Sequence, residues 1–277
     1  MAAKAAALPT CYWFDRRQAT RGRMDAKILW RTPGGTEAVR RAGSRCDFGG
    51  TPGTVEGRGQ HHGRASRAVA VGLPSQKKSL RAAEQDRPDV KAKRDQWREQ
   101  APQLERCRLV FIDESGAKTN MTRLYARAFG GKRAVDTAPH GHWCTTTMIS
   151  ALRFDGSTVD MVLDGATDGD AFLAYAREIL TPSLQRGDIV VMDNLAAHKM
   201  AAVVETIEAS GAEVWFLPPY SPDFNPIEKM WSKIKAYLRK VKARTKDELW
   251  QAIGAGLKTV TAADALGWFQ SCGYIRT

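Results

Sequence analysis

The chain has few cysteines and no long apolar run, and these shortages exclude several classes of protein. Its 277 residues include five cysteines, which are widely spaced and form no C-x-x-C pair. Neither a disulfide framework nor a zinc site is therefore indicated. No apolar run approaches the roughly 20 residues that a membrane-spanning helix needs, and the N-terminus lacks the charged-then-apolar order of a signal peptide. We expect reduced thiols and a cytoplasmic location.

Histidine is equally scarce, and most of it lies in two pairs, His61 with His62 and His140 with His142. No cysteine or acidic residue stands beside either pair at the spacing of metal ligands. Imidazole metal sites normally draw further ligands from such neighbours. These four histidines are therefore not predicted to bind a metal.

Positive charge is abundant but unevenly distributed. The net charge is +12, and residues 1–106 hold 22 Lys and Arg against 11 Asp and Glu, whereas residues 107–277 hold 20 against 19. A basic segment joined to a balanced one indicates a polyanionic partner, and nucleic acid is favoured over membrane because no amphipathic helix with a clear apolar face accompanies the charge. Solubility alone would be the plainer reason for such charge.

The composition divides the chain into three parts. Residues 1–75 are rich in Gly, Arg and Ala without sustained periodicity, which predicts a poorly structured basic region. Residues 76–106 are highly charged and predict a basic connector with a short helix from Pro88 to about Gln100, in which Val90, Arg94 and Trp97 fall at helical spacing. Residues 107–277 have the regular pattern of a folded domain.

Within that last part the pattern predicts three strands followed by alternating helices and strands. The turn Asp155-Gly156 would join the second and third strands as a hairpin. The result is an α/β fold with a mixed five-stranded sheet flanked by helices. We predict strands at 107–113, 143–152, 157–163, 189–193 and 213–217, and helices at 168–180, 198–210, 226–242 and 245–257.

Three acidic residues stand at the ends of predicted elements. Asp113 follows the run Leu-Val-Phe-Ile, Asp193 follows Ile-Val-Val-Met, and Glu228 falls in the first turn of a helix. If the first and fourth strands are neighbours, the two aspartates meet. Singly, each aspartate reads as a turn or cap residue, and Glu228 reads as the third residue of a capping box begun by Asn225.

Together the three carboxylates indicate a metal site for phosphodiester chemistry. Carboxylate oxygens are the ligands that Mg²⁺ and Mn²⁺ prefer. Two such ions about 3.5 to 4 Å apart can hold the attacking and leaving oxygens of a phosphoryl displacement. Glu114 adjoins Asp113, but adjacent strand residues point to opposite faces of a sheet, so only one of them can face the metals, and we favour Asp113.

Three motifs carry a resemblance to a known family. They are Phe111-Ile-Asp113-Glu-Ser, Met192-Asp193-Asn-Leu-Ala-Ala-His198, and the run from Leu217 to Glu228, Leu-Pro-Pro-Tyr-Ser-Pro-Asp-Phe-Asn-Pro-Ile-Glu. The segment from about 107 to 277 resembles the catalytic domain of DDE transposases, in particular the mariner-like group of bacterial insertion sequences. The resemblance implies an RNase H-like fold.

The same resemblance implies a function. Asp113, Asp193 and Glu228 would be the catalytic residues and the ligands of two Mg²⁺ or Mn²⁺ ions. The enzyme would be an Mg-dependent endonuclease and strand transferase that performs cut-and-paste transposition in the bacterial cytoplasm. Its partners would be double-stranded DNA, as terminal inverted repeats and as target, and a second copy of the chain once the DNA ends are bound.

Several further residues are candidates for contact with DNA. Asn194 and His198 would touch phosphate or position water, or else be a turn residue and a surface or capping histidine. The helix after Glu228 has a basic outer face, and a basic loop lies between the first two strands; a solvated charged face is the alternative for the helix. The basic candidates are Lys229, Lys233, Lys235, Arg239, Arg123 and Lys132.

The chain departs from the family in its first 75 residues. The helix-turn-helix modules that such transposases use to recognise DNA ends are not found there. The composition of these residues is typical of coding sequence read in an alternative frame. Two other functions stay open: another RNase H-like nuclease or resolvase, or an inactive transposase remnant that only binds DNA.

Overall fold

The computed structural model describes residues 11–14 and 81–275. The prediction of a poorly structured basic region over residues 1–75 lies outside these residues, except for one strand at Cys11–Phe14. Among the helices of residues 81–275, none is long and apolar enough to cross a membrane.

A mixed sheet forms the centre of the fold. In the described residues it has six strands in the order β1-β4-β3-β2-β5-β6. β2, β3 and β4 are antiparallel neighbours, while β5 and β6 run parallel to β2. The strands are β1 (Cys11–Phe14), β2 (Leu109–Lys118), β3 (Thr145–Arg153), β4 (Thr158–Asp164), β5 (Ile189–Met192) and β6 (Glu213–Phe216).

The five predicted strands are confirmed, with two differences. β2 continues to Lys118, five residues past its predicted end at Asp113, because all nine residues from Val110 to Lys118 pair with β3. β1, which was not predicted, runs parallel to β4 and adds a sixth strand. The predicted hairpin turn is present: Gly156 has φ +82°, a conformation that favours glycine, and donates to the carbonyl of Arg153.

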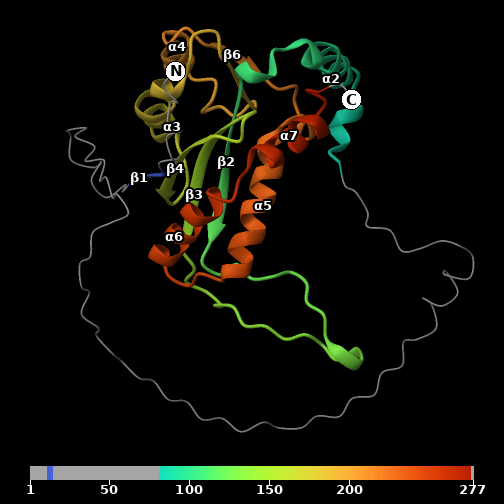
Figure 1. The fold of residues 1–277 in the computed structure, drawn as a ribbon, viewed down its shortest axis with the longest axis vertical. Helices are drawn as coiled ribbons and strands as arrows, with labels where there is room; N and C mark the ends of the chain where they lie inside the picture. Colours follow the sequence, from blue (N-terminus) through green and yellow to red (C-terminus); the bar gives the residue numbers. More distant parts are fainter. Residues whose placement is uncertain (1–10, 15–80, 276–277) are drawn as a thin grey trace, which may run out of the picture. The chain divides into compact units, whose positions relative to one another are not determined.

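Helices cover both faces of the sheet because its strands are apolar on both sides. Leu109 and Phe111 of β2 pack on the side of α5, whereas Val110 and Ile112 pack on the side of α3 and α4. Figure 1 shows the long α5 along one face, with α3 and α4 on the other. The helices are α2 (Pro88–Gln100), α3 (Gly169–Tyr175), α4 (Ala201–Glu208), α5 (Pro226–Val241), α6 (Lys246–Leu257) and α7 (Ala262–Ser271).

The helix predictions hold in position but not in every detail. α3 continues into a π-helical turn at Ala176–Leu180, and α7 was not predicted. The start of α7 has a clear signal in Thr261, whose side chain accepts a hydrogen bond from the N–H of Asp264 while the Asp264 carboxylate accepts from the N–H of Thr261. The prediction overlooked this acidic variant of the capping box.

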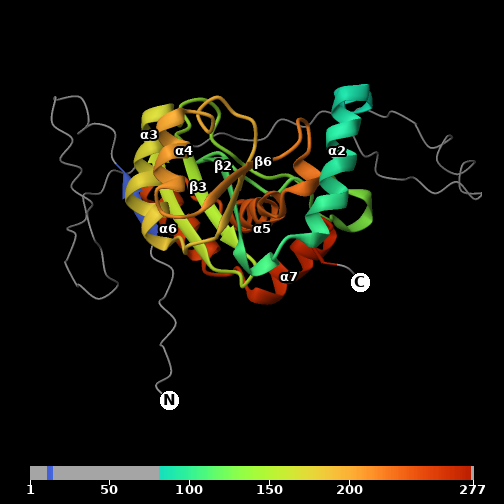
Figure 2. The ribbon, with the colours of Figure 1, turned by 90° about the horizontal axis from the view of Figure 1, so that it is seen from above.

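Helix α2, the short helix predicted within residues 76–106, packs into the core. Val90, Arg94 and Trp97, which share one face of the helix, are all buried. Trp97 lies in the same apolar cluster as α5 and α7, and its ring meets Trp215 of β6 at a centroid distance of 6.1 Å. Figure 2 shows α2 beside α7 at one side of the sheet. The helix therefore extends the folded unit upstream of residue 107.

A long arm, residues 119–144, leaves the body between β2 and β3 (Figure 1). Its base is fixed from the loop after α5: Lys242 Nζ lies 2.6 Å from Asp136 Oδ2, and Arg244 donates to the carbonyls of Thr119 and Met121 at 2.9 and 3.0 Å. Beyond this base the arm presents apolar side chains to solvent. The most exposed are Leu124, Tyr125, Phe129 and Val135, at 69 to 96%.

An aspartate is buried within the sheet itself. Asp160 of β4 is 2% exposed and accepts hydrogen bonds from the hydroxyls of Ser150 at 2.5 Å and Thr158 at 2.7 Å. Burial raises the pKa of Asp160 to about 6, although the two hydroxyls oppose the shift. Because the folded chain holds this proton more tightly than the unfolded chain, Asp160 makes the protein less stable as pH rises from about 4 to 6.

We predict that Asp160→Asn makes the protein about 2 kcal/mol more stable at pH 7, since it removes the cost of a buried carboxylate while Ser150 and Thr158 can still bond to the amide. Urea unfolding at pH 4 and pH 7 would measure this. The gain should be smaller at pH 4, and Asp155→Asn in the exposed turn is the control. A variant that is less stable than wild type at pH 7 would contradict the prediction.

Candidate active site

Asp113 lies within a buried strand and not at a turn. It pairs in register with Ser150 of β3, its side chain is on the face covered by α5, and it is 8% exposed. Burial raises the pKa of Asp113 to about 8, with further contributions from the negative charges of Glu228 and Glu114. A carboxylate held in this way is costly unless a proton or a cation compensates it.

Asp193 follows the last residue of β5. β5 pairs with β2 so that Phe111 stands opposite Val191, and the same register brings Asp193 level with Asp113. The predicted meeting of the two strands is thus confirmed. Asp193 Oδ1 accepts a hydrogen bond from the N–H of Leu195 at 2.9 Å. Partial burial raises the pKa of Asp193, but His198 and this N–H outweigh burial and hold it below the usual range.

Glu228 lies in the first turn of α5, and its carboxylate does not cap the helix. Asn225 is the N-cap residue, yet no side-chain bond caps this helix, whereas α6 and α7 both begin with complete capping boxes. The capping interpretation of Glu228 is therefore wrong. Glu228 is exposed, but nearby atoms still remove part of its hydration and raise its pKa; Lys235 opposes the shift and Asp193 adds to it.

His198 bridges two of the acidic residues from a buried position. Its Nε2 lies 2.9 Å from Glu114 Oε2, and its Nδ1 lies 2.7 Å from Asp193 Oδ1. The contact of Nδ1 with Asp193 is an ion pair whose angle does not suit a hydrogen bond, since Nδ1 has no partner in hydrogen-bond geometry. The ring is fully buried and packs on Phe172 at a centroid distance of 4.3 Å.

The charge of His198 follows from these neighbours. Burial disfavours the imidazolium, but the carboxylates of Asp193 and Glu114 outweigh burial and raise the pKa of His198 to about 9. Glu114 points to the α3 side of the sheet, opposite to Asp113, as strand alternation predicts. Neither a surface histidine nor a contact with phosphate fits a side chain with no exposed area.

The acidic residues suit a divalent cation by their chemistry. Burial raises the pKa of Asp113 most, and the negative charges of Glu228, Glu114 and Asp193 raise it further, so these acids repel one another. Such repulsion is what a bound Mg²⁺ or Mn²⁺ would relieve. Among residues 81–275, no three acidic, histidine or cysteine side chains already converge as a ligand shell.

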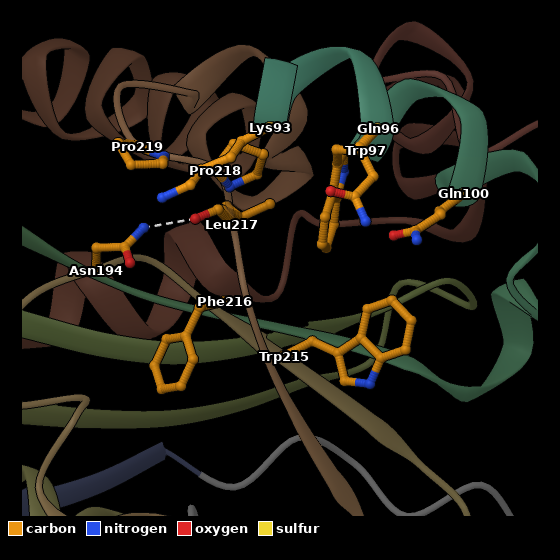
Figure 3. A pocket seen from close by; sticks show the side chains of 10 residues that line it. All are labelled: Lys93, Gln96, Trp97, Gln100, Asn194, Trp215, Phe216, Leu217, Pro218 and Pro219. Atoms are coloured by element: carbon orange, nitrogen blue, oxygen red, sulfur yellow. Dashed lines mark hydrogen bonds between the residues drawn. The ribbon is translucent and has the colours of Figure 1, made fainter. Parts of the chain in front are cut away.

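A cavity of about 350 Å³ lies between α2 and the end of β6 (Figure 3). Lys93, Gln96 and Gln100 line it from α2, and Trp215 lines it from β6. Asn194 forms another wall, and its amide points to the carbonyl of Leu217, to which it donates a hydrogen bond. This hydrogen bond ties Asn194, which directly follows Asp193, to the loop that leads to Glu228.

The remaining basic candidates have different surroundings. Lys233 is engaged within the protein, since its Nζ lies 2.5 Å from Asp264 Oδ2 and donates to the carbonyl of Thr259 at 2.7 Å. Arg123 and Lys132 are exposed on the arm. On α5, Lys229, Lys235 and Arg239 are partly exposed, while the apolar residues Ile227, Trp231, Ile234 and Leu238 are buried.

Two supporting residues were not assigned a role from the sequence. Glu114 was set aside as a weaker ligand, and Arg94 was noted only for its helical spacing. Arg94 is 5% exposed and bonds to Ser221 and Asp223. A charged residue on an otherwise apolar helix face, with Val90 and Trp97 on either side, was the signal that could have identified it.

Comparison with known proteins agrees with this geometry. Residues 108–250 match the family model described as DDE superfamily endonuclease. The structure resembles that of the Mos1 transposase paired-end complex with left transposon end, at a TM-score of 0.60 and 15% identity over 76% of this chain. The structure also resembles the mariner Mos1 paired end complex with Mg, at a TM-score of 0.61 and 16% identity, again over 76% of this chain. No curated protein sequence matched.

These matches establish the fold and leave part of the related proteins uncovered. The chain spans 66% of the Mos1 chain in both complexes. The Mos1 catalytic domain alone matches at a TM-score of 0.50 and 15% identity, with 71% of this chain and 91% of that domain covered. The predicted RNase H-like fold is thus confirmed.

We predict that His198→Ala lowers stability by about 3 kcal/mol at pH 6, since Glu114 and Asp193 would lose their shared cation and a buried ring would leave a cavity. The pKa of His198 lies above its ordinary value, so its contribution is full below about pH 6.5 and is lost as pH rises through about 9. Denaturant unfolding between pH 6 and 9 measures both effects. The exposed His142→Ala is the control, and equal losses in the two variants would contradict the prediction.

Proposed function

We propose a function from one premise: this chain belongs to the DDE superfamily of endonucleases, whose family model its residues 108–250 match. We infer that it cleaves DNA in a metal-dependent reaction with Asp113, Asp193 and Glu228 as catalytic residues. The observation that carries this proposal is electrostatic. Burial and the charges of Glu228, Glu114 and Asp193 raise the pKa of Asp113 to about 8, where two parallel strands and the start of α5 meet.

Each residue has a part in this mechanism. Asp113, Asp193 and Glu228 would hold two Mg²⁺ or Mn²⁺ ions, which supply an activated nucleophile and neutralise charge at the phosphate. Asp113 is the rigid member, because its backbone lies within β2 and pairs with Ser150 of β3. His198 orients Asp193 and stays outside the reaction. Glu228 is the exposed member and closes the site from α5.

The finer proposal is cut-and-paste DNA transposition by a bacterial insertion sequence in the cytoplasm. Transposon-end DNA and strand transfer appear in the names of the Mos1 complexes that this chain resembles. The net charge of +12 and the partly exposed Lys229 and Arg239 of α5 favour DNA as partner. Terminal inverted repeats and target DNA would be the two substrates, and hydrolysis followed by attack of the freed 3′-hydroxyl would be the two steps.

Pairing of two copies on DNA ends belongs to the same proposal. The arm of residues 119–144 supports it, because Phe129 at 96% and Tyr125 at 84% exposure place aromatic surface in water. Apolar surface of this kind is common where a second protein docks. The base of the arm is held by Lys242 and Arg244.

We predict that Glu228→Gln lowers Mg²⁺-dependent nicking of supercoiled plasmid at least about a hundredfold, because it removes a metal ligand. Its side chain is exposed and caps no helix, so the fold should be unchanged by circular dichroism. Asp193→Ala should be equally inactive, and Asp170→Asn, an exposed acid at the start of α3, should nick like wild type. Equal nicking by wild type, Glu228→Gln and Asp193→Ala would contradict the proposed function.

We predict that replacing Tyr125 and Phe129 together by serine leaves the free protein folded but prevents assembly of two copies on end DNA. Size exclusion with light scattering on the complex measures its stoichiometry. Leu266→Ser is the matched control, since Leu266 is also an exposed apolar residue, at 46%, on α7. If the double variant assembles as the wild type does, the arm does not mediate the pairing of two copies.

A further inference from the structure

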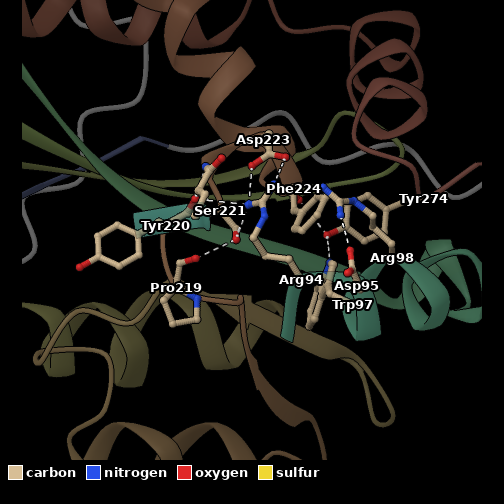
Figure 4. Close-up of polar contacts among 11 residues, drawn as sticks. Arg94, Asp95, Trp97, Arg98, Pro219, Tyr220, Ser221, Asp223, Phe224 and Tyr274 are labelled. Atoms are coloured by element: carbon tan, nitrogen blue, oxygen red, sulfur yellow. Dashed lines mark hydrogen bonds and ion pairs between the residues drawn. The ribbon is translucent and has the colours of Figure 1, made fainter. Parts of the chain in front are cut away.

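One buried arginine holds the loop that leads to Glu228. Arg94 of α2 donates from Nη2 to Asp223 Oδ2 at 2.7 Å and from Nη1 to Asp223 Oδ1 at 2.9 Å (Figure 4). The same Nη1 lies 2.7 Å from Ser221 Oγ and 3.3 Å from the carbonyl oxygen of Tyr220. Its guanidinium also lies over the ring of Phe224, 4.6 Å from the centroid. One side chain thus contacts four residues of this loop.

A second chain of contacts reaches the same loop from the C-terminal end. Trp97 Nε1 donates to Tyr274 Oη at 3.1 Å, and Tyr274 Oη donates to the carbonyl of Phe224 at 2.7 Å. Trp97 and Tyr274 are both buried. Arg94, Trp97 and Tyr274 all lie outside residues 108–250, which match the family model. The loop is therefore held by the parts of the chain that flank the matched segment.

The contacts end immediately before the residues that set the position of Glu228. The loop closes in the 3₁₀ turn Pro222–Phe224, and α5 begins at Pro226. Asn225, between them, makes no side-chain cap bond, so the start of the helix has no capping side chain of its own. Glu228 follows Phe224 by four residues, about one helical turn. A shift of the turn would therefore move the first turn of α5 and its carboxylate.

We propose that Arg94 is a positioning residue for Glu228, acting through the turn Pro222–Phe224 to bring this carboxylate into the metal site of the catalytic residues. The proposal rests on the proposed function and adds to it a residue outside the matched segment. Arginine suits the task because its planar fork can meet both oxygens of Asp223 while another N–H reaches Ser221. A lysine offers one point charge and cannot reproduce the pattern.

A purely structural role would have a different signature. If Arg94 only stabilised the protein, its loss would lower the melting temperature without altering how activity depends on metal concentration. If it positions Glu228, its loss weakens metal binding, because a small displacement of one ligand is enough to disturb a site. The Mg²⁺ concentration at half-maximal rate therefore separates the two roles.

The experiment compares Arg94→Lys and Asp223→Asn with Arg98→Lys in the full chain. Asp223 has a half-exposed side chain, so its variant should fold even if a change at the buried Arg94 does not. Arg98 is the matched control: it lies one turn along the same helix and over the same Phe224 ring at 5.4 Å, but its side chain is 53% exposed and pairs with Asp95. Asp193→Ala reports on the proposed function.

Three measurements are made on each protein. Nicking is followed across Mg²⁺ concentrations, and Mn²⁺ binding is followed separately by the rise in melting temperature. Hydrogen exchange of the peptides that cover residues 217–231 is measured without metal. We expect Arg94→Lys and Asp223→Asn to raise the half-maximal Mg²⁺ concentration about tenfold and to speed exchange in these peptides, with Arg98→Lys unchanged.

Unchanged exchange at residues 217–231 in both variants would overturn the proposal, and so would faster exchange with an unaltered Mg²⁺ dependence. If Arg94→Lys does not fold, Asp223→Asn alone decides. A wild type that neither nicks DNA nor gains stability from Mn²⁺ would overturn the proposed function and, with it, the positioning of Glu228 in a metal site. A wild type that is active while Arg94→Lys and Asp223→Asn keep its Mg²⁺ dependence would overturn the positioning role alone.

Discussion

Repulsion among acidic side chains above an apolar sheet is the constraint on which the structure depends. Val110, Phe111 and Ile112 are almost fully buried, and the next residue along β2 is Asp113. Glu114, Asp193 and Glu228 contribute to the raised pKa of Asp113, so none of the four is electrostatically independent. Like charges in a poorly hydrated setting destabilise the folded state unless each is compensated.

The chain compensates these charges in different ways. His198 serves Glu114 and Asp193 together, and its imidazolium is itself kept protonated by them. Glu228 faces solvent and has Lys235 nearby. The charged form of Asp113 accepts a hydrogen bond from the N–H of Glu114, but burial still makes the loss of its proton costly. Asp113 is therefore the acid whose negative charge a bound cation would stabilise most, and it is also the one held rigidly within a strand.

Much of the fold was predictable because the chain signals it locally. The apolar runs before Asp113 and Asp193 each indicated a strand that the structure contains, and the Asp155-Gly156 turn indicated the hairpin that it contains. The end of β2 was not predictable, since Gly116 and Lys118 interrupt the apolar pattern and only pairing with β3 keeps them in the strand.

Of the site, only the acidic residues were predictable from the sequence, and their catalytic role stays a proposal. Their supports are long-range: His198 meets a residue 84 positions away, and Arg94 meets one 129 positions away. Sequence spacing carries no sign of such contacts. His198 in particular packs on Phe172 of a different helix, so its neighbours in the sequence left open a contact with phosphate or water and a surface or capping position, and gave no sign of burial.

The aromatic packing around Phe111 has a practical consequence for fragments of this protein. Its ring meets Phe269 at a centroid distance of 5.3 Å and Tyr274 at 5.0 Å, and both partners lie beyond residue 250. A fragment cut at the borders of the family match would keep the central strand and discard its aromatic cover. Such a fragment would expose an apolar surface to water and aggregate, although it contained every acidic residue of the site.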